Sequence, residues 1–380
     1  MITANTVGAR MDAAGGFTSG FDYMRLFLSL LVMVSHSAAI SGDTSAGFLP
    51  DFIDSDIGHG ILPVFFALSG FLVAASLMRT KTLLTFLILR GLRIVPALMV
   101  EITLSAMVLG PLLTTSSYGD YFTGKDFFQY FLNIMGYIHY HLPGVFLDNP
   151  IPRMVNGSLW TVPYEAECYL ALAGLAVFGI VRRPKLFMSG FLLLLCGLYV
   201  WTLVFGETGP PRGTATGRQL VLFFLGGVLL YLWRGKIPYS GWIAWAAAAA
   251  SAAFISSHQA IYLLPLPVAY LTLYLGLQTP RKLPVIFNGD YSYGIYLYAF
   301  PIQQSVSYLL PKGQPWYVNV LVSLLFVGPF AAFSWHCIEK PTLRLKKYIV
   351  DRSEKLAPRE AAVPLLAETG GQPALGMAHI

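Results

Sequence analysis

Long apolar runs alternate with short polar connections along most of the chain. About ten apolar segments can be drawn, and most approach the ~20 residues that a helix needs to cross ~30 Å of hydrocarbon. They cover residues 21–40, 60–78, 94–113, 160–180, 186–205, 220–233, 242–255, 261–277, 291–310 and 316–338. The pattern predicts an all-α fold, a polytopic membrane helix bundle of about ten transmembrane helices. The segments 220–233 and 242–255 are the shortest, and the pattern leaves open whether they span fully.

Composition supports a membrane protein. Hydrophobic residues make up 56% of the 380 residues and charged residues only 12%, about half the charged share of a typical soluble domain, ~25%. The net charge of +6 comes from short loops between apolar segments, which argues against a nucleic-acid partner. Cys168, Cys196 and Cys337 all lie in apolar stretches and suggest neither a disulfide framework nor a metal site.

The basic residues favour alternate connections. With a cytoplasmic N-terminus, all but five of the 25 lysines and arginines fall on the inner side; the five are Lys125, Arg153, Arg212, Arg218 and Lys312. The positive-inside rule therefore predicts a multi-pass protein of the inner membrane with both termini in the cytoplasm. We expect a cytoplasmic segment at 1–20, a membrane domain at 21–341, and a basic, then disordered, tail at 342–380. The aromatic run 127–141 is too short to span and is expected to be interfacial or re-entrant.

Ionisable side chains inside the apolar segments are hypotheses for function, because a charge in hydrocarbon is costly. Arg25 and His36 are eleven residues apart, or roughly 16 Å of helix, which places Arg25 toward the cytoplasm and His36 toward the outer face. The apolar segment that contains Glu165 enters the membrane from the outer side, which places Glu165 at a depth similar to that of His36. If the two helices are neighbours, this carboxylate could orient or charge the imidazole. For Glu101 we expect a partner arginine.

Arg90 and Arg93 lie three residues apart and share one helix face. Paired guanidiniums at a membrane boundary suit a phosphate-bearing ligand, because each can bind phosphate with two hydrogen bonds. The alternative is a topology signal that faces lipid headgroups. His139 and His141 could suggest a metal, but no cysteine or carboxylate ligand follows at a suitable spacing, and we predict none.

Several ordered motifs resemble those of one family. They are FDYMRLFLSLLVMVSH at 21–36, VFFALSGFLV at 64–73, RGLRIVPAL at 90–98, NGSLWTVPYEAECYL at 156–170, GDYSYGIYLYAFP at 289–301 and EKP at 339–341. In this order they resemble the membrane-bound acyltransferase-3 family, over residues 22 to about 341. One position departs: many members have a histidine where this chain has Ala299, and Gln303 and Gln304 are the polar residues that could compensate.

The resemblance implies an integral membrane O-acyltransferase. Such an enzyme moves an acyl group, commonly acetyl, from cytoplasmic acyl-CoA to a hydroxyl of a carbohydrate or glycolipid at the outer face, as in lipopolysaccharide or exopolysaccharide modification. His36 would act as general base or carry the acyl group itself. The site would comprise His36 and Glu165 for catalysis, Arg25, Arg90 and Arg93 for the acetyl-CoA donor, and Trp160, His59 and Tyr164 for the acceptor.

A second class of function uses the same residues. A transporter or flippase of a glycan-type substrate would also place Arg, His and Glu within its helices, as a substrate or proton site. The chain shows no repeated halves, and the ordered motifs point to the acyltransferase. Turnover of acyl-CoA separates the two, because a transporter does not consume it.

Overall fold

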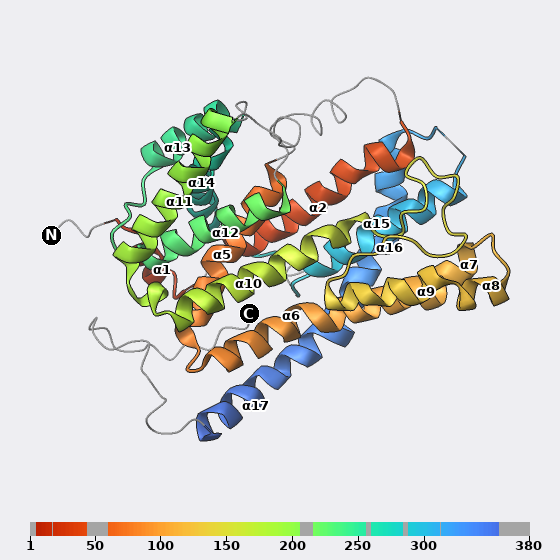
Figure 1. Ribbon diagram of the computed structural model, residues 1–380, viewed down its shortest axis with the longest axis horizontal. Coiled ribbons are helices and arrows are strands. Elements are labelled where there is room, and N and C mark those ends of the chain that lie inside the picture. The colour runs from red at the N-terminus through yellow and green to blue at the C-terminus, as the bar shows by residue number, and fades with distance from the viewer. Residues whose placement is uncertain are drawn as a thin grey trace.

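The computed structural model describes residues 5–16, 18–43, 60–205, 216–255, 260–283, 288–311 and 313–356. All regular secondary structure in these ranges is helical (Figure 1). Each of the ten apolar segments contains a helix, as predicted. These helices are α2 (Ser19–Ser41), α5 (Ile61–Arg79), α6 (Leu83–Leu104), α10 (Val162–Val177), α11 (Pro184–Phe205), α12 (Gly217–Leu232), α13 (Gly241–Ile255), α14 (Pro265–Gly276), α15 (Ser292–Leu309) and α16 (Trp316–Phe333).

The membrane bundle is confirmed, but the count of ten spanning helices is not. Within the described residues, five helical stretches are long and apolar enough to cross a membrane. They are Ser19–Ser41, Ile61–Arg79, Leu83–Leu113, Pro184–Phe205 and Trp316–Val350. The two segments that the sequence left open form the shorter apolar helices α12 and α13.

The outside of the bundle is apolar. Leu193 on α11, Trp242 on α13 and Leu325 on α16 are 75%, 84% and 71% exposed. Soluble monomers rarely expose large contiguous apolar patches. These helices therefore present their side chains to lipid acyl chains, and the molecule is a multi-pass membrane protein.

Helix α5 lies in the interior, packed against α12, α14, α2 and α10. It approaches α12 closely through two glycines. A Cβ on Gly70 would lie 1.9 Å from the carbonyl oxygen of Phe224, and one on Gly227 would lie 2.0 Å from that of Ala67. Small residues at such a crossing let membrane helices approach at backbone distance, so this pair forms the centre of the fold.

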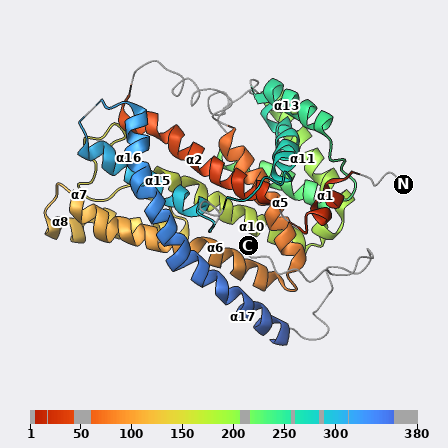
Figure 2. The ribbon, with the colours of Figure 1, turned by 180° about the vertical axis from the view of Figure 1, so that it is seen from behind.

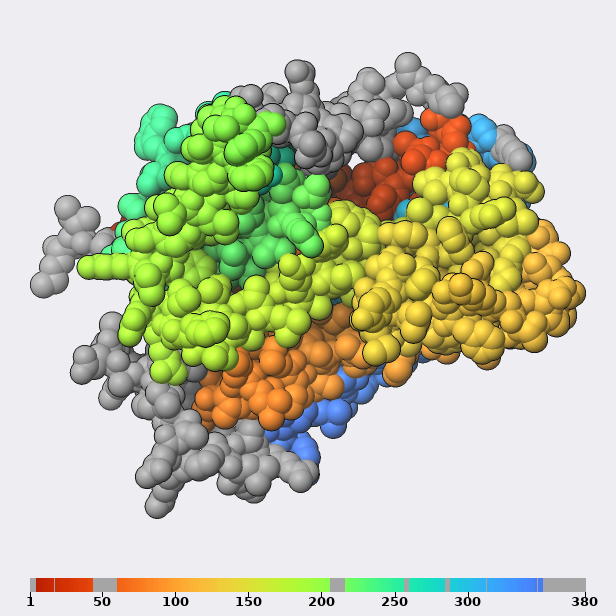
Figure 3. All heavy atoms as spheres, in the orientation of Figure 1, coloured from red at the N-terminus to blue at the C-terminus, as the bar shows by residue number. Residues whose placement is uncertain are grey.

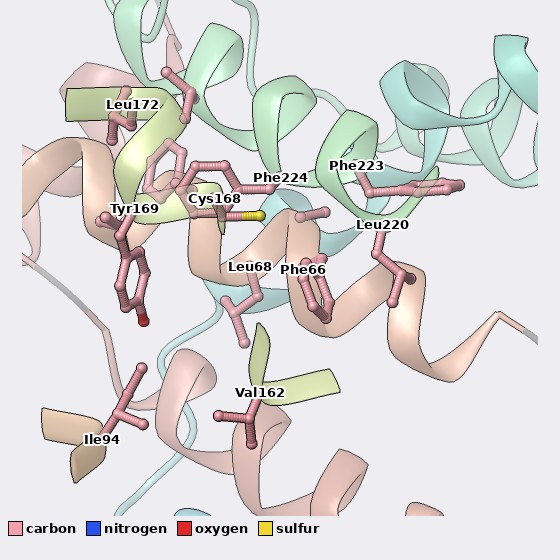
Figure 4. Packing of buried hydrophobic residues seen from close by; sticks show 14 of the residues in the cluster. Phe66, Leu68, Ile94, Val162, Cys168, Tyr169, Leu172, Leu220, Phe223 and Phe224 are labelled. Atoms are coloured by element: carbon pink, nitrogen blue, oxygen red, sulfur yellow. The ribbon is translucent and has the colours of Figure 1, made fainter. Parts of the chain in front are cut away.

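Helix α10 covers the other side of α5. Cys168, Tyr169 and Leu172 of α10 pack in one cluster with Leu68 of α5 and Phe224 of α12 (Figure 4). The ring centroids of Tyr169 and Phe224 are 6.4 Å apart. The packing buries the ring of Tyr169 and fixes the direction in which its hydroxyl points.

The boundary of α6 differs from the prediction. The sequence suggested a segment from residue 94, but the helix begins at Leu83, where the Thr82 hydroxyl accepts a hydrogen bond from the Thr85 N–H. Arg90 and Arg93 therefore lie within the helix and not before it. The helix runs on through a π-helical stretch, Ser105–Leu109, into α7 (Gly110–Leu113).

The aromatic run after α7 forms short helices. These are α8 (Tyr118–Thr123) and α9 (Lys125–Tyr130), the latter followed by a 3-10 turn at Phe131–Met135. Tyr121 is buried, and its hydroxyl donates to the carbonyl of Ala106. Six-residue helices cannot cross a bilayer, as the sequence predicted for this run.

Helix α16 continues past a π-helical segment, Ser334–Glu339, into α17 (Lys340–Leu356). Together they form one long rod that crosses the molecule (Figure 2). Helix α17 lies along α6. The tail expected from residue 342 is thus helical as far as Leu356, and its remainder lies outside the described residues.

Candidate active site

Six charged side chains form a chain of ion pairs beside the first turns of α2. They alternate in sign in the order Lys282, Asp22, Arg25, Asp290, Arg93 and Glu339, and successive members are 2.6–3.2 Å apart. We call this set the ion-pair chain. Its members come from α2, α6, the π-helical segment after α16, and the connections before and after residues 284–287. It therefore ties together segments from the whole length of the sequence.

Asp290 is the centre of the ion-pair chain. Its Oδ2 lies 3.1 Å from Arg25 and 2.6 Å from Arg93, and its Oδ1 accepts a hydrogen bond from the Ser292 hydroxyl. Burial alone would raise the pKa of this carboxyl, but the charges of the two arginines lower the pKa below its usual range. Two of the three predicted donor-binding arginines thus share one partly buried carboxylate.

Arg90 is held differently. Its guanidinium donates to the Ser76 hydroxyl at 3.2 Å and lies 6.0 Å from the ring centroid of Tyr169. Among the described residues it forms no ion pair at contact distance. Lys346 of α17 interacts electrostatically with both Arg90 and Arg79. A group of positive charges from α5, α6 and α17 therefore gathers around the one predicted arginine that no carboxylate neutralises by direct contact.

Glu165 lies near Arg90 and not beside His36. Its carboxylate accepts a hydrogen bond from the Tyr169 hydroxyl at 2.5 Å. It also interacts electrostatically with Arg90 and Arg93. The described residues show no hydrogen bond between Glu165 and His36, so the contact expected from their matched depths is absent. Equal depth in the membrane does not fix the direction in which each helix points its side chains.

His36 lies on α2, eleven residues beyond Arg25. Its ring meets Phe300 edge-on, with centroids 5.2 Å apart. The Nδ1 atom is buried and has no hydrogen-bond partner in the described part of the chain. In Figure 3, α2 is visible at the bottom of a hollow between α12 and the start of α10. An imidazole without a carboxylate partner is available to act as a base or a nucleophile.

The predicted acceptor residues divide into two groups. Trp160 and Tyr164 lie together at the start of α10, with ring centroids 6.0 Å apart. Tyr164 also packs against Gly217 of α12, where a Cβ would overlap its ring. His59 lies outside the described residues, so the prediction for it stays a prediction.

Two other expectations are corrected or refined. Glu101 is fully buried, and its partners are the Ser105 hydroxyl at 2.8 Å and the Asn156 amide at 3.0 Å rather than an arginine. Ala299, at the position of the family's second histidine, packs in an apolar cluster with Met33. Gln303 lies on the neighbouring turn of α15 and donates to the Met33 carbonyl at 2.9 Å.

Four residues that complete these arrangements were not among the predicted site residues. They are Asp290 and Glu339 in the ion-pair chain, Tyr169 between Arg90 and Glu165, and Asn156 beside Glu101. Asp290 and Glu339 stand in the GDYSYG and EKP motifs, at the ends of apolar runs. Each acid stands at the end of an apolar run and so needs a partner of opposite charge, and Arg25 and Arg93 need acids for the same reason. This match was the signal available in the sequence.

Comparison with known proteins identifies the family. A family model described as an acyltransferase domain matches residues 18–338. An O-acetyl transferase of Shigella phage Sf6 is 29% identical over 334 residues, which cover 84% of this chain and 94% of that protein. Nodulation protein 10 of Rhizobium leguminosarum bv. viciae is 29% identical over 388 aligned positions, which cover 92% of this chain and all of that protein.

No solved structure matches the chain. The matched residues include α2, five of the six members of the ion-pair chain, and the predicted acceptor residues His59, Trp160 and Tyr164. Glu339, the sixth member, lies one residue beyond the match. The motifs that suggested the resemblance all fall within or directly beside the matched residues. The chain therefore belongs to the acyltransferase-3 family and is a membrane-embedded O-acyltransferase.

Proposed function

We propose that the protein transfers an acetyl group from acetyl-CoA at the cytoplasmic face to a hydroxyl of a carbohydrate or glycolipid at the outer face of the inner membrane. The observation that carries the proposal is the family match, which includes α2. This helix has Arg25 near one end and His36, whose Nδ1 has no partner among the described residues, toward the other. The phage relative, which is named an O-acetyl transferase, supports acetyl as the group transferred.

Arg90 is the strongest candidate for binding the donor's phosphates. Arg25 and Arg93 already bind Asp290, so an anion would compete with this carboxylate for them. Arg90 forms no ion pair among the described residues, so it offers positive charge without that competition, and Lys346 adds a second cation nearby. Guanidinium and ammonium groups together are the usual recognition set for phosphate. Arg25 and Arg93 then act mainly by fixing the position of α6 beside α2.

His36 would carry the chemistry. In the direct route its imidazole takes the proton of the acceptor hydroxyl while the oxygen attacks the thioester carbonyl. The carbon–sulfur bond breaks, and the imidazolium returns the proton to the leaving thiolate, which departs as the free thiol of CoA. In the two-step route one imidazole nitrogen attacks the thioester carbonyl, the carbon–sulfur bond breaks, and the leaving thiolate takes the ring proton and departs as the thiol of CoA. The acceptor hydroxyl then takes the acetyl group from the nitrogen and returns its proton to the ring. Both routes leave the imidazole as it began.

The distance between the arginines and His36 suits a CoA thioester. About 16 Å of α2 separates Arg25 from His36, and Arg90 lies at the Arg25 end of the bundle beside Arg93. The highly charged nucleotide of CoA would stay at the cationic end, where charge is tolerated. The thinner, mostly uncharged pantetheine arm would reach inward between the helices toward the imidazole.

The test uses membranes that contain the wild-type protein or His36→Ala, supplied with acetyl-CoA labelled in the acetyl group. We expect label in ester linkage on extracted glycan with the wild type, and a loss of roughly 10²–10⁴-fold in the variant. His141→Ala is the matched control, because His141 is exposed. Absence of donor turnover by a folded wild-type protein would overturn the proposal and favour transport.

Purified wild type and His36→Ala in glycan-free lipid nanodiscs separate the two routes. Without acceptor, the two-step route predicts label on the wild-type protein that His36→Ala lacks. The direct route predicts no labelled protein but normal transfer once acceptor is added.

A further inference from the structure

A cavity of about 310 Å³ lies at the end of α2 that is opposite Arg25. Ser41 of α2, the end of α15, Asn319 of α16 and the segment around Asp148 enclose it. Its volume is at the lower end of the ~300–1,000 Å³ range of small-molecule sites. Neither the family match nor the comparison with relatives assigns a role to this cavity.

The walls of the cavity are held in place by hydrogen bonds. The Asn149 amide donates to Gln304 Oε1 at 2.8 Å, and the Ser307 hydroxyl donates to the Ile40 carbonyl at 2.7 Å. These bonds connect the loop, α15 and α2. A cavity with fixed walls binds a ligand without the cost of ordering side chains.

Three buried polar atoms next to the cavity have no partner in the described part of the chain. They are Asn319 Oδ1, Gln303 Oε1 and Ser323 Oγ. Asn319 lines the cavity and is 2% exposed, and its amide nitrogen donates to the Gln303 carbonyl at 3.0 Å. Buried polar atoms in native proteins nearly always have a hydrogen-bond partner. Because Asn319 lines the cavity, its Oδ1 is the buried acceptor best placed to receive a hydrogen bond from a molecule bound there.

The cavity is close to His36. The side chain of Gln303 donates to the carbonyl of Met33, which is one turn before His36 on the same face of α2. Ser41, which lines the cavity, is five residues beyond His36, or about 7.5 Å of helix. Measured along the axis of α2, the cavity therefore lies one to two turns beyond His36.

The lining indicates the chemistry of the occupant. Asp148 is exposed and forms no ion pair among the described residues, Gln314 forms no hydrogen bond there, and Tyr308 presents a half-exposed ring. A carboxylate and amides bind groups that both donate and accept hydrogen bonds, and an aromatic ring packs against apolar C–H groups. A sugar ring carries both features. A phosphate would be repelled by Asp148.

We propose that this cavity binds a sugar ring of the acceptor and turns one of its hydroxyls toward His36. The proposal rests on the function proposed above, since it names where that enzyme would hold its acceptor. Sugar hydroxyls would donate to Asn319 Oδ1 and to the Asp148 carboxylate, and Gln314 would bind a further hydroxyl. Tyr308 would cover one face of the ring.

The test compares the purified full-length wild type with Asp148→Asn, Gln314→Ala and Asn319→Leu in lipid nanodiscs. The probe is the total glycan extract of the source cells, with labelled acetyl-CoA as donor. We expect KM for the extract, in hexose equivalents, to rise about tenfold in each variant. The kcat and the KM for acetyl-CoA should change less than twofold. Asp126→Asn is the matched control, an exposed carboxylate on α9 that does not line the cavity.

Asp148 and Gln314 are not buried, so their variants stay informative even if Asn319→Leu fails to fold. If the wild type transfers label and the Asp148 and Gln314 variants match Asp126→Asn, the cavity is not the acceptor site and the proposed function stands. If the folded wild type transfers no label to any glycan, the proposed function falls, and this inference falls with it.

Discussion

The polar side chains near the two ends of α2 differ in whether they have partners of opposite charge or hydrogen-bond partners. Near its start, Asp22 and Arg25 belong to the ion-pair chain, in which every charge has a partner of opposite sign. Toward its end, His36 Nδ1, Gln303 Oε1 and Asn319 Oδ1 are buried with no partner among the described residues. At the first end the fold balances the charges, even though Arg25 Nε is also buried without a hydrogen-bond partner among the described residues. Toward the second end, these three atoms have neither an ion pair nor a hydrogen bond there. This contrast fits a first end that holds the helices together, and it supports the proposal that the acceptor binds toward the second.

The largest effect on stability should come from removing Asp290, the centre of the ion-pair chain at the start of α2. Asp290→Ala leaves Arg25 and Arg93 without their shared carboxylate. Loss of one partner of a fully buried ion pair costs about 3–5 kcal/mol, and these partly buried groups should lose somewhat less. We expect a large fall in Tm or in the yield of folded protein in detergent. Asp126→Ala, at an exposed position, is the control. An unchanged Tm would show that the ion-pair chain is not what holds these helices.

The ion pairs of Asp290 with Arg25 and Arg93 also make the stability of the fold depend on pH. Because the pKa of Asp290 is lowered in the folded protein, its stabilisation is complete above the ordinary aspartate pKa, near ~4, and is lost as the pH falls through the folded value. The Tm difference between wild type and Asp290→Asn should therefore narrow below pH ~4. Thermal scans at several pH values measure it. A difference that widened in acid would contradict the assignment.

The next effect separates the arginines. Arg90→Gln should raise the KM for acetyl-CoA roughly 10- to 100-fold, the loss of one charge-assisted contact to phosphate, with little change in Tm. Arg93→Gln should lower Tm first, because it leaves Asp290 and Glu339 underpaired. Arg183→Gln, at an exposed position, is the matched control. Equal donor KM values for Arg90→Gln and the control would place the phosphates elsewhere.

A smaller effect is expected at Glu165. Its contacts are with Tyr169 and the arginines, so Glu165→Gln should remove negative charge near the donor and lower the KM for acetyl-CoA a few-fold. The kcat should fall less than tenfold. The hypothesis that this carboxylate orients His36 predicts a much larger loss of kcat, up to ~10⁴-fold by analogy with a catalytic triad. Steady-state kinetics of the one variant decides between the two.

The helices were predictable from the sequence because long apolar runs leave few other structures open in a membrane. The start of α6 was missed because Arg90 and Arg93 resemble a polar boundary, yet Asp290 and Glu339 neutralise Arg93 within the fold. These partners are 197 and 246 residues away in sequence, a distance over which no local pattern pairs residues. Helical rise likewise gave the depths of His36 and Glu165, but not the directions in which they point.

The smallest predicted effect tests the unpaired end. Ser323 is fully buried, and its hydroxyl has no partner among the described residues. If the hydroxyl serves only the fold, Ser323→Ala removes an unsatisfied polar group and should stabilise the protein by up to about 1 kcal/mol, with activity unchanged. If it binds an acceptor hydroxyl or a bridging water, the same change raises the acceptor KM two- to threefold while Tm stays level or rises. Ser29→Ala is the control, because Ser29 is equally buried but donates to the Leu26 carbonyl. A variant that gains stability and loses acceptor affinity would show that this end of α2 gives up stability in order to bind its substrate.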